Sequence, residues 1–255
     1  MEPATGCQAC RDGEALGFDF SMAFQPIVEP RRRRVFAYEA LVRGLDGSGA
    51  AGVLGKLDAT NLYRFDQACR LKAVTLAARL GMDCRLSINF MPNAVYQATT
   101  CLRATLATAR RVGFPTELLM FEFVEHEQAH DRAHLASIVA EYRRHGFLTA
   151  LDDFGAGYSG LALLADIQPD RIKLDMALVR GIDRDPVRQS IVRHTLAMCE
   201  ELGVAVIAEG IETAGEWRAL EALGVTLFQG YLFARPGFEC LPEVHWPEGD
   251  ASGER

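Results

Sequence analysis

Short runs rich in apolar and β-branched residues alternate along the chain with longer segments whose apolar positions recur at helical spacing. This alternation predicts a parallel sheet whose strands are joined by helical crossovers. The helical spacing is clearest at residues 65–80, 130–145 and 186–202. The predicted strands are Met22–Val28, Val35–Val42, Arg85–Phe90, Leu118–Phe123, Phe147–Asp152, Arg171–Leu174, Val204–Ala208 and Thr226–Phe228.

The connection between the first two predicted strands is too short to hold a helix. Only residues 29–34 separate them, whereas a parallel crossover needs about a dozen residues. These two strands should therefore pair as an antiparallel hairpin. The expected fold is α/β, a modified TIM (β/α)8 barrel with an antiparallel first strand pair. The arginines at positions 31–34 fall in the hairpin turn, where we expect a solvated turn, with a partner or phosphate patch as the alternative.

No linker of Pro, Gly or Ser composition divides the chain. We therefore expect one domain over residues 18–246, between flexible tails at residues 1–17 and 247–255. The Gly-rich segment Gly44–Gly55 is expected to form a loop over the barrel mouth. Cys7 and Cys10 form a CxxC pair, which we interpret as part of the mobile tail, with a redox or metal element as the alternative.

Composition narrows the classes of partner. The 255 residues are 49% hydrophobic, enough for a sizeable core, and their net charge of -7 argues against polymeric nucleic acid as a partner. The first residues lack the basic and apolar runs of a signal peptide, and charges interrupt every apolar stretch before membrane-spanning length. Seven cysteines, an odd number, fit reduced thiols, so we expect a cytoplasmic protein that does not associate with membranes.

Polar side chains stand where the predicted strands end, and in a barrel these ends converge on the face where catalytic sites lie. Five of them are carboxylates and one is a cation, so they would repel one another unless divalent cations bind among them. Oxygen ligands without a His or Cys cluster favour magnesium, manganese or calcium, and two such ions suit in-line attack on a phosphodiester. The residues concerned are Glu39, Asn89, Glu122, Asp152, Asp153, Lys173, Glu209 and Gln229.

Each of these residues, taken alone, also has a structural interpretation. Glu39 could pair with a nearby arginine, and Asp152 and Asp153 could cap a helix or a turn. The functional interpretation depends on their occurrence together at successive strand ends.

The same residues lie in sequence blocks that resemble the EAL domain family. The block that names the family is Tyr38-Glu-Ala-Leu-Val-Arg-Gly, which follows Phe24-Gln-Pro-Ile-Val. Further blocks occur in the order of the family and extend the resemblance over roughly residues 18–240. They are Ser87-Ile-Asn-Phe, Phe121-Glu-Phe-Val-Glu, Leu151-Asp-Asp-Phe-Gly-Ala-Gly-Tyr-Ser-Gly-Leu, Ile172-Lys-Leu-Asp, Ile207-Ala-Glu-Gly-Ile-Glu-Thr and Phe228-Gln-Gly-Tyr-Leu-Phe-Ala-Arg-Pro.

The resemblance implies a metal-dependent phosphodiesterase that hydrolyses cyclic di-GMP, a bacterial second messenger, to the linear dinucleotide 5'-pGpG. It implies two bound ions, Mg2+ or Mn2+, while Ca2+ should inhibit because its looser geometry misplaces the attacking water. The implied ligands are Glu39, Asn89, Glu122 and Asp152 for one ion, and Asp152 and Asp153, with Glu209 close by, for the other. The implied catalytic residues are Glu209, Lys173 and Gln229, and the implied substrate contacts are Gln25, Leu41, Arg43 and Asp175.

Beyond the metal site, the resemblance implies a homodimer and a loop, residues 153–160, that is braced by Glu125. The sequence departs from the family pattern at Val124, where a Thr is usual, and at Gly160, where a Ser is frequent. The main alternative is a catalytically silent cyclic di-GMP receptor that signals through a protein partner. An interaction module that binds no nucleotide and a different magnesium-dependent barrel enzyme are further alternatives. We expect regulation by another protein in trans, by oligomerisation or by the N-terminal tail.

Overall fold

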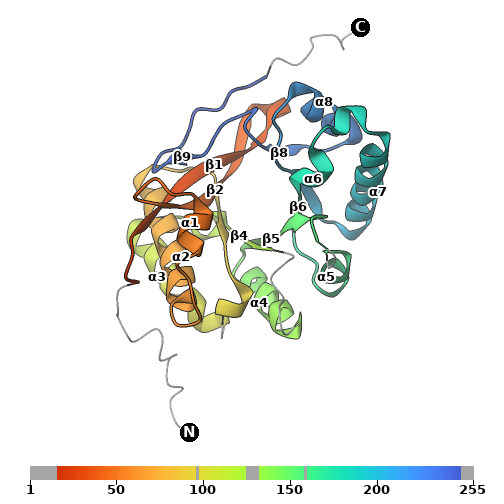
Figure 1. Ribbon diagram of the computed structural model, residues 1–255. Coiled ribbons are helices and arrows are strands. Elements are labelled where there is room, and N and C mark those ends of the chain that lie inside the picture. Colours follow the sequence, from red (N-terminus) through yellow and green to blue (C-terminus); the bar gives the residue numbers. More distant parts are fainter. Residues whose placement is uncertain (1–15, 96–97, 125–131, 158–159, 248–255) are drawn as a thin grey trace.

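The strands form a barrel with helices around its outside (Figure 1). The computed structural model describes residues 16–95, 98–124, 132–157 and 160–247. Around the described sheet the order is β2-β3-β4-β5-β6-β7-β8-β1-β9, and a pairing between β2 and β1 closes the barrel. The strands are β1 Phe20–Glu29, β2 Arg34–Gly44, β3 Arg85–Asn89, β4 Leu119–Val124, β5 Leu148–Phe154, β6 Arg171–Leu174, β7 Ala205–Ala208, β8 Leu227–Gln229 and β9 Gly237–Phe238.

The helices lie between successive parallel strands, as the alternating pattern predicted. The segments expected to be helical near residues 65–80, 130–145 and 186–202 correspond to α2, α4 and α7. The α-helices are α1 Ala50–Leu54, α2 Leu62–Arg79, α3 Ala98–Val112, α4 Arg132–Arg144, α5 Gly160–Asp166, α6 Met176–Val179, α7 Pro186–Leu202 and α8 Ala214–Leu223. Short 3-10 turns occupy Pro30–Arg32, Pro92–Ala94, Thr116–Leu118 and Ile182–Arg184.

The first two strands form the predicted antiparallel hairpin, with Gln25 opposite Glu39. The turn between them is exposed, as expected for a solvated turn. Its arginines pair with acids at the surface: Arg31 with Glu221, and both Arg32 and Arg34 with Glu29. The barrel is therefore a modified TIM barrel, in which β1 runs antiparallel to both of its barrel neighbours, β2 and β8.

Apolar side chains fill two separate volumes. The larger cluster lies between the strands and the helices, and includes Phe65 of α2 and Tyr142 of α4. A smaller cluster, which includes Ile27, Met120 and Ile207, is formed by strand residues alone and fills the inside of the barrel toward the amino ends of the parallel strands. The barrel interior thus contains an apolar layer, and the polar residues at the carboxyl ends of the strands lie above this layer.

One segment differs from the sequence expectation. Gly44–Gly55, expected to be a loop, contains the short helix α1, because Val53 is fully buried against the core. Most of both predicted tails lies outside the described residues, but Leu16 of the first tail packs against the main core. None of the helices among the described residues combines the length and the apolarity needed to cross a bilayer.

Candidate active site

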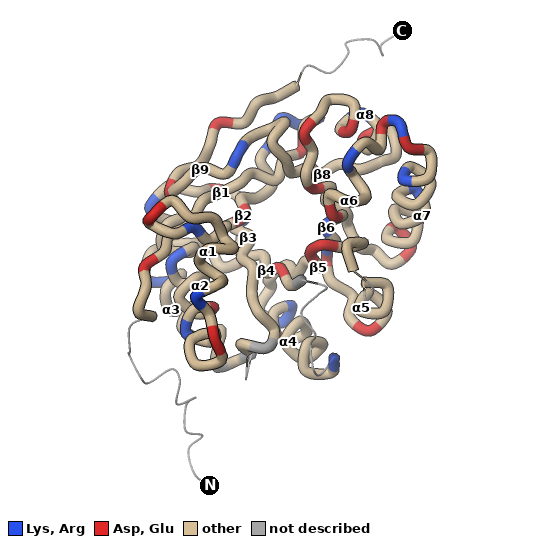
Figure 2. The backbone as a smooth tube through the Cα atoms, in the orientation of Figure 1, with Lys and Arg blue, Asp and Glu red and all other residues tan. Residues whose placement is uncertain are grey.

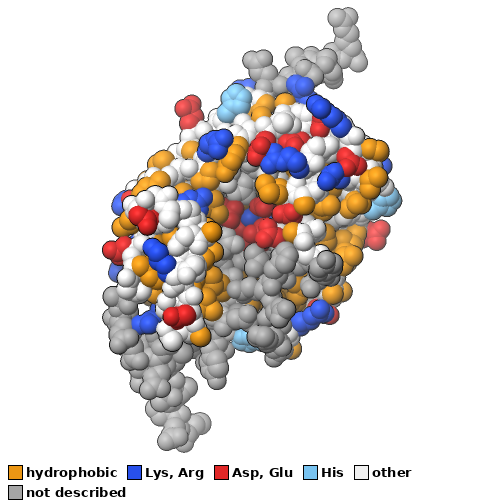
Figure 3. Space-filling model, viewed as in Figure 1, with side chains coloured by type: hydrophobic (Ala, Val, Ile, Leu, Met, Phe, Trp, Pro, Cys, Tyr) orange, Lys and Arg blue, Asp and Glu red, His pale blue; other side chains and the backbone are white. Residues whose placement is uncertain are grey.

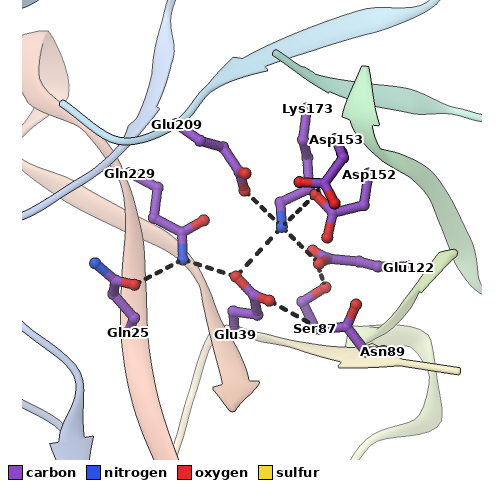
Figure 4. Close-up of polar contacts among 10 residues, drawn as sticks. All are labelled: Gln25, Glu39, Ser87, Asn89, Glu122, Asp152, Asp153, Lys173, Glu209 and Gln229. Atoms are coloured by element: carbon purple, nitrogen blue, oxygen red, sulfur yellow. Dashed lines mark hydrogen bonds and ion pairs between the residues drawn. The ribbon is translucent and has the colours of Figure 1, made fainter. Parts of the chain in front are cut away.

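The polar residues predicted at the strand ends meet at the carboxyl-terminal mouth of the barrel (Figure 4). Acidic positions line the inner edge of the chain at this mouth (Figure 2), and in the space-filling view acidic side chains gather in a central hollow (Figure 3). The strand register places them together, because Asn89 of β3 is the parallel partner of Glu122 of β4. The backbone N–H of Glu209 donates to the carbonyl of Leu174, which fixes Glu209 beside the end of β6.

Asp152 and Asp153 are adjacent in β5, yet both face the site. Side chains that follow one another in a regular strand point to opposite faces. Here the pairing of β5 with β6 is irregular between Leu151 and Phe154, and Asp153 has a positive φ of 54°. This left-handed residue breaks the alternation, and aspartate is among the few residues that tolerate it. The bulge therefore brings two neighbouring carboxylates to one site.

Lys173 lies at the centre of the carboxylates and is only 1% exposed. Its ammonium Nζ forms four ion pairs with the surrounding acids. The distances are 2.5 Å to Glu209 Oε1, 2.6 Å to Glu122 Oε2, 3.1 Å to Asp152 Oδ1 and 3.2 Å to Glu39 Oε2. A buried ammonium is stable only with such partners, so Lys173 is held in place by the acids that it faces.

Neutral side chains orient two of the acids. Asn89 Nδ2 donates to one oxygen of Glu39 at 2.8 Å, and Gln229 Nε2 donates to the other oxygen at 2.8 Å. Ser87 Oγ donates to Glu122 Oε1 at 2.5 Å, and both residues are fully buried. The sequence interpretation did not single out Ser87 for a role, although its position two residues before Asn89 in β3 places it on the same face.

Burial and mutual repulsion shift the pKa values of the acids. Burial, with repulsion from Glu39 and Asp152, raises the pKa of Glu122 to about 8 against the pull of Lys173. Burial and neighbouring acids also raise the pKa values of Asp152 and Glu209. Burial pushes the pKa of Glu39 upward too, but Lys173 and the hydrogen bonds from Gln229 and Asn89 outweigh it and leave that pKa below its usual value.

Lys173 itself stays protonated. Burial alone would lower its pKa, but the attraction of Asp152, Glu122, Glu209 and Glu39 outweighs burial and holds the pKa well above its usual value. Shifted pKa values cluster at functional sites, so these acids are candidates for a functional role.

The donor set fits two divalent cations. Within the described residues, the carboxylate oxygens of Glu39, Glu122 and Asp152 lie within 4.8 Å of one another, as do those of Asp152, Asp153 and Glu209. The two groups share Asp152, which could bridge two ions. Every donor is an oxygen, the ligand type that magnesium, manganese and calcium prefer. Gln229 Oε1 is buried beside this cluster without a hydrogen-bond donor among the described residues, so it could accept a hydrogen bond from a bound water.

The predicted substrate contacts lie around this cluster but not all in one cavity. Gln25 and Leu41 line a cavity of about 270 Å3 together with Glu39, Lys173 and Gln229. Gln25 Nε2 donates to the carbonyl of Ala234 and its Oε1 accepts from Gln229. This links the wall of the cavity to the Glu39 network.

Arg43 and Asp175 stand apart from that cavity. Arg43 lines a neighbouring hollow with Pro236 and Phe238, and its Nη1 donates to the carbonyl of Val42. Asp175 caps helix α6 by accepting from the N–H of Ala177 at 2.8 Å. Glu125 and residues 158–159 of the predicted loop lie outside the described residues.

Comparison with known proteins gives the same family along most of the chain. The model of the EAL domain family matches residues 13–236. The blue light- and temperature-regulated antirepressor BluF of Escherichia coli (strain K12) is 33% identical over 227 residues, which are 89% of this chain and 56% of that protein. The cyclic di-GMP phosphodiesterase PA2567 of Pseudomonas aeruginosa is 31% identical over 241 residues, which are 90% of this chain and 40% of that protein. The chain thus spans about half the length of these curated relatives.

Solved structures with similar folds contain ligands that the resemblance implied. A standalone versatile EAL protein from Vibrio cholerae O395, in a c-di-GMP bound form, superposes with a TM-score of 0.88 at 52% identity, over 91% of this chain and 98% of that chain. Klebsiella pneumoniae BlrP1, in a complex with manganese and cyclic di-GMP, superposes with a TM-score of 0.82 at 36% identity, over 89% of this chain and 57% of that chain. The chain belongs to the EAL domain family.

Proposed function

We propose that this protein is a two-metal phosphodiesterase that hydrolyses cyclic di-GMP to 5'-pGpG. The observation that carries the proposal is the complete set of oxygen donors around a buried lysine at the barrel mouth. Five ionised carboxylates and one ammonium sum to four negative charges, which two divalent cations would neutralise. A site that only packed the barrel would not need this excess of buried acid.

The residues divide between the two ions according to the two groups of carboxylates. Glu39, Asn89, Glu122 and Asp152 would hold one ion, while Asp152, Asp153 and Glu209 would hold the second. When bound, Mg2+ or Mn2+ would activate a water molecule and neutralise charge on the phosphodiester. The ligand atom of Asn89 would be its carbonyl oxygen, because its Nδ2 already donates a hydrogen bond to Glu39.

In the proposed reaction, side chains of the protein would accept a proton and orient the attacking water. Glu209 would accept a proton from the attacking water, for which a carboxylate with a raised pKa is well suited. Lys173 would hold the water oxygen in line with the phosphorus, and Gln229 would accept a hydrogen bond through its buried Oε1. The bond from phosphorus to the 3' oxygen breaks as the bond to water forms, which leaves a 5'-phosphate and a 3'-hydroxyl.

The remaining parts of the proposal concern the substrate and the assembly. Gln25 and Leu41 would contact the dinucleotide within the cavity, and Arg43 and Asp175 would contact it from the neighbouring rim. Arg43 suits a phosphate because a guanidinium can bind two oxygens at once. We also propose a cytoplasmic homodimer, with Glu125 bracing the loop at residues 153–160.

A turnover assay tests the proposal. Metal-stripped protein is incubated with cyclic di-GMP, with and without Mg2+ or Mn2+, and the products are separated by chromatography. We expect 5'-pGpG only when metal is present, and loss of turnover in Glu39→Ala, which removes a ligand. Glu117→Ala, which removes an exposed carboxylate far from the site, should keep wild-type turnover. Wild-type turnover in Glu39→Ala would disprove the ligand assignment.

The second candidate is a receptor that binds cyclic di-GMP and signals without hydrolysis. The similarity to BluF, an antirepressor by name, favours this candidate. Calorimetry distinguishes the two, because a receptor would bind the dinucleotide and give no product in saturating Mn2+. The ligand set among the described residues is complete, so we favour the enzyme.

A further inference from the structure

Two partly buried arginines meet at the opposite end of the barrel from the carboxylates. Arg85 begins β3 and Arg171 begins β6. Since side chains alternate along a strand, Arg85 shares the inward face of Ser87 and Asn89, and Arg171 shares the inward face of Lys173. Arg85 and Arg171 stand at the amino ends of their strands, whereas Asn89 and Lys173 stand nearer the carboxyl ends. Both guanidiniums therefore lie at the amino-terminal end of the barrel, which we call its floor, below the active site.

Phe36 brings the two guanidiniums together. The pairing of β1 with β2 slips at this point, since Ile27 pairs with Ala37 and Val28 pairs with Val35, which leaves Phe36 without a partner residue. This bulge turns the Phe36 ring into the inner apolar cluster, where it is 7% exposed. The guanidinium carbon of Arg85 lies 4.9 Å from the ring centroid and that of Arg171 lies 4.5 Å from it.

Among the described residues, neither guanidinium forms an ion pair with an acid, although Asp170 attracts Arg171 electrostatically. Within the described part of the chain, Arg85 and Arg171 form no side-chain hydrogen bond or ion pair, and the Nε atom of each is buried without an acceptor. The nearest acid in sequence, Asp170, is engaged by the N–H and hydroxyl of Thr149 and by Arg143. At the hairpin turn on the same floor, Glu29 is engaged by Arg32 and Arg34.

The arrangement therefore holds two like charges together without an acid in direct contact among the described residues, and a bound anion would reduce their repulsion. The repulsion is visible at Arg171, because burial and the charge of Arg85 lower its pKa against the attraction of Asp170. The floor can be reached from solvent, because both arginines are only partly buried and Ala205, the neighbour of Arg171 in β7, is exposed. Guanidiniums bind oxyanions through charge-assisted, bidentate hydrogen bonds.

We propose that Arg85 and Arg171, held on Phe36, form a binding site for a small oxyanion such as inorganic phosphate at the floor of the barrel. The bound anion would accept hydrogen bonds from both guanidiniums and neutralise their repulsion. The site is separate from the carboxylate cluster and does not depend on hydrolysis of cyclic di-GMP. Its occupancy would stabilise β3 and β6 at their amino ends.

Thermal unfolding of the metal-stripped protein tests this site. Metal is removed with a chelating resin, because a soluble chelator would add carboxylates. Without metal, the acids at the other mouth repel an anion. With phosphate at ten times its dissociation constant, we expect a rise in Tm of about 3–6 °C relative to chloride of the same ionic strength. The variants R85Q and R171Q should lose most of this rise, whereas R111Q, which removes an exposed arginine at the end of α3, should keep it.

Direct titration of phosphate by calorimetry gives the second readout. The variant R171K, which keeps the charge but loses the fork of donors, should bind phosphate at least several-fold more weakly, and it carries the test if R171Q does not fold. The proposal is overturned if phosphate stabilises the wild type no more than chloride does. It is also overturned if R85Q and R171Q retain the full stabilisation, since the arginines would then only close the floor of the barrel.

Discussion

At the scale of single residues, Ser87 has a role that only the folded structure discloses. Its hydroxyl donates to Glu122 from inside the barrel, while Lys173 holds the other oxygen of the same carboxylate. Serine in the middle of a strand carries no chemical signal in the sequence, and Glu122 lies 35 positions away. The acids at the strand ends could be predicted because each stands at a boundary that the apolar pattern already marks.

The Ser87 contact leads to a prediction about metal affinity. Ser87→Ala should weaken Mn2+ binding about tenfold to hundredfold, the usual effect of removing a hydrogen bond to a metal ligand. The fold should persist, because the change removes one hydroxyl. Ser21→Ala is the matched control, since Ser21 also donates to a carboxylate, that of Glu239, away from the site. Calorimetric titration with Mn2+ measures both variants, and equal weakening in the two would show that Ser87 has no special role.

At the scale of elements, the hairpin was predictable and the two bulges were not. The short connection after β1 excludes a helical crossover whatever the rest of the chain does. A bulge depends on the register between two strands, which the sequence of one strand does not determine. Phe36 and Asp153 both owe their inward positions to such irregularities. The family resemblance predicted a metal-binding role for Asp153, whereas nothing in the sequence predicted the inward position of Phe36.

The bulge in β5 gives a prediction that separates the effect of the backbone conformation at Asp153 from the effect of its charge. Asp153→Asn and Asp153→Ala remove the same carboxylate, so both should weaken binding of the second metal ion. Only alanine should also lose stability, by about 1 kcal/mol, because asparagine tolerates the left-handed backbone at Asp153 and alanine does not. Urea unfolding of the metal-free variants measures the difference. Equal stability of the two would mean that the bulge relaxes when Asp153 is replaced.

At the scale of the whole molecule, the barrel is polarised along its axis. Acids crowd its carboxyl-terminal mouth around one lysine, and arginines occupy its floor and the adjacent hairpin turn. The net charge of -7 in the sequence argues against polymeric nucleic acid as a partner but could not reveal this separation of charge, because the separation depends on which face of each strand points inward. The polarity favours cations at one end and anions at the other.

Because the acids are crowded at one mouth, the pH dependence of the free energy of unfolding should differ between the metal-free and the metal-bound protein. In metal-free protein, the Glu122 pKa rises from 4.5 when unfolded to about 8 when folded, and those of Asp152 and Glu209 are raised too. An acid with a raised folded pKa stabilises the fold below its unfolded pKa, and this contribution is lost as pH rises toward the folded value. The metal-free protein should therefore become less stable between about pH 4.5 and 8.

Magnesium should reverse this trend, because each ion must displace the protons that these acids hold at low pH. Its affinity should rise about tenfold per pH unit for each proton displaced, so the gain in Tm on adding Mg2+ should be larger at pH 8 than at pH 6. Thermal unfolding with and without Mg2+ at a series of pH values measures both trends. A metal-induced gain that is the same at every pH would mean that these acids are already ionised in the metal-free protein, and that Lys173 alone suffices to keep them so.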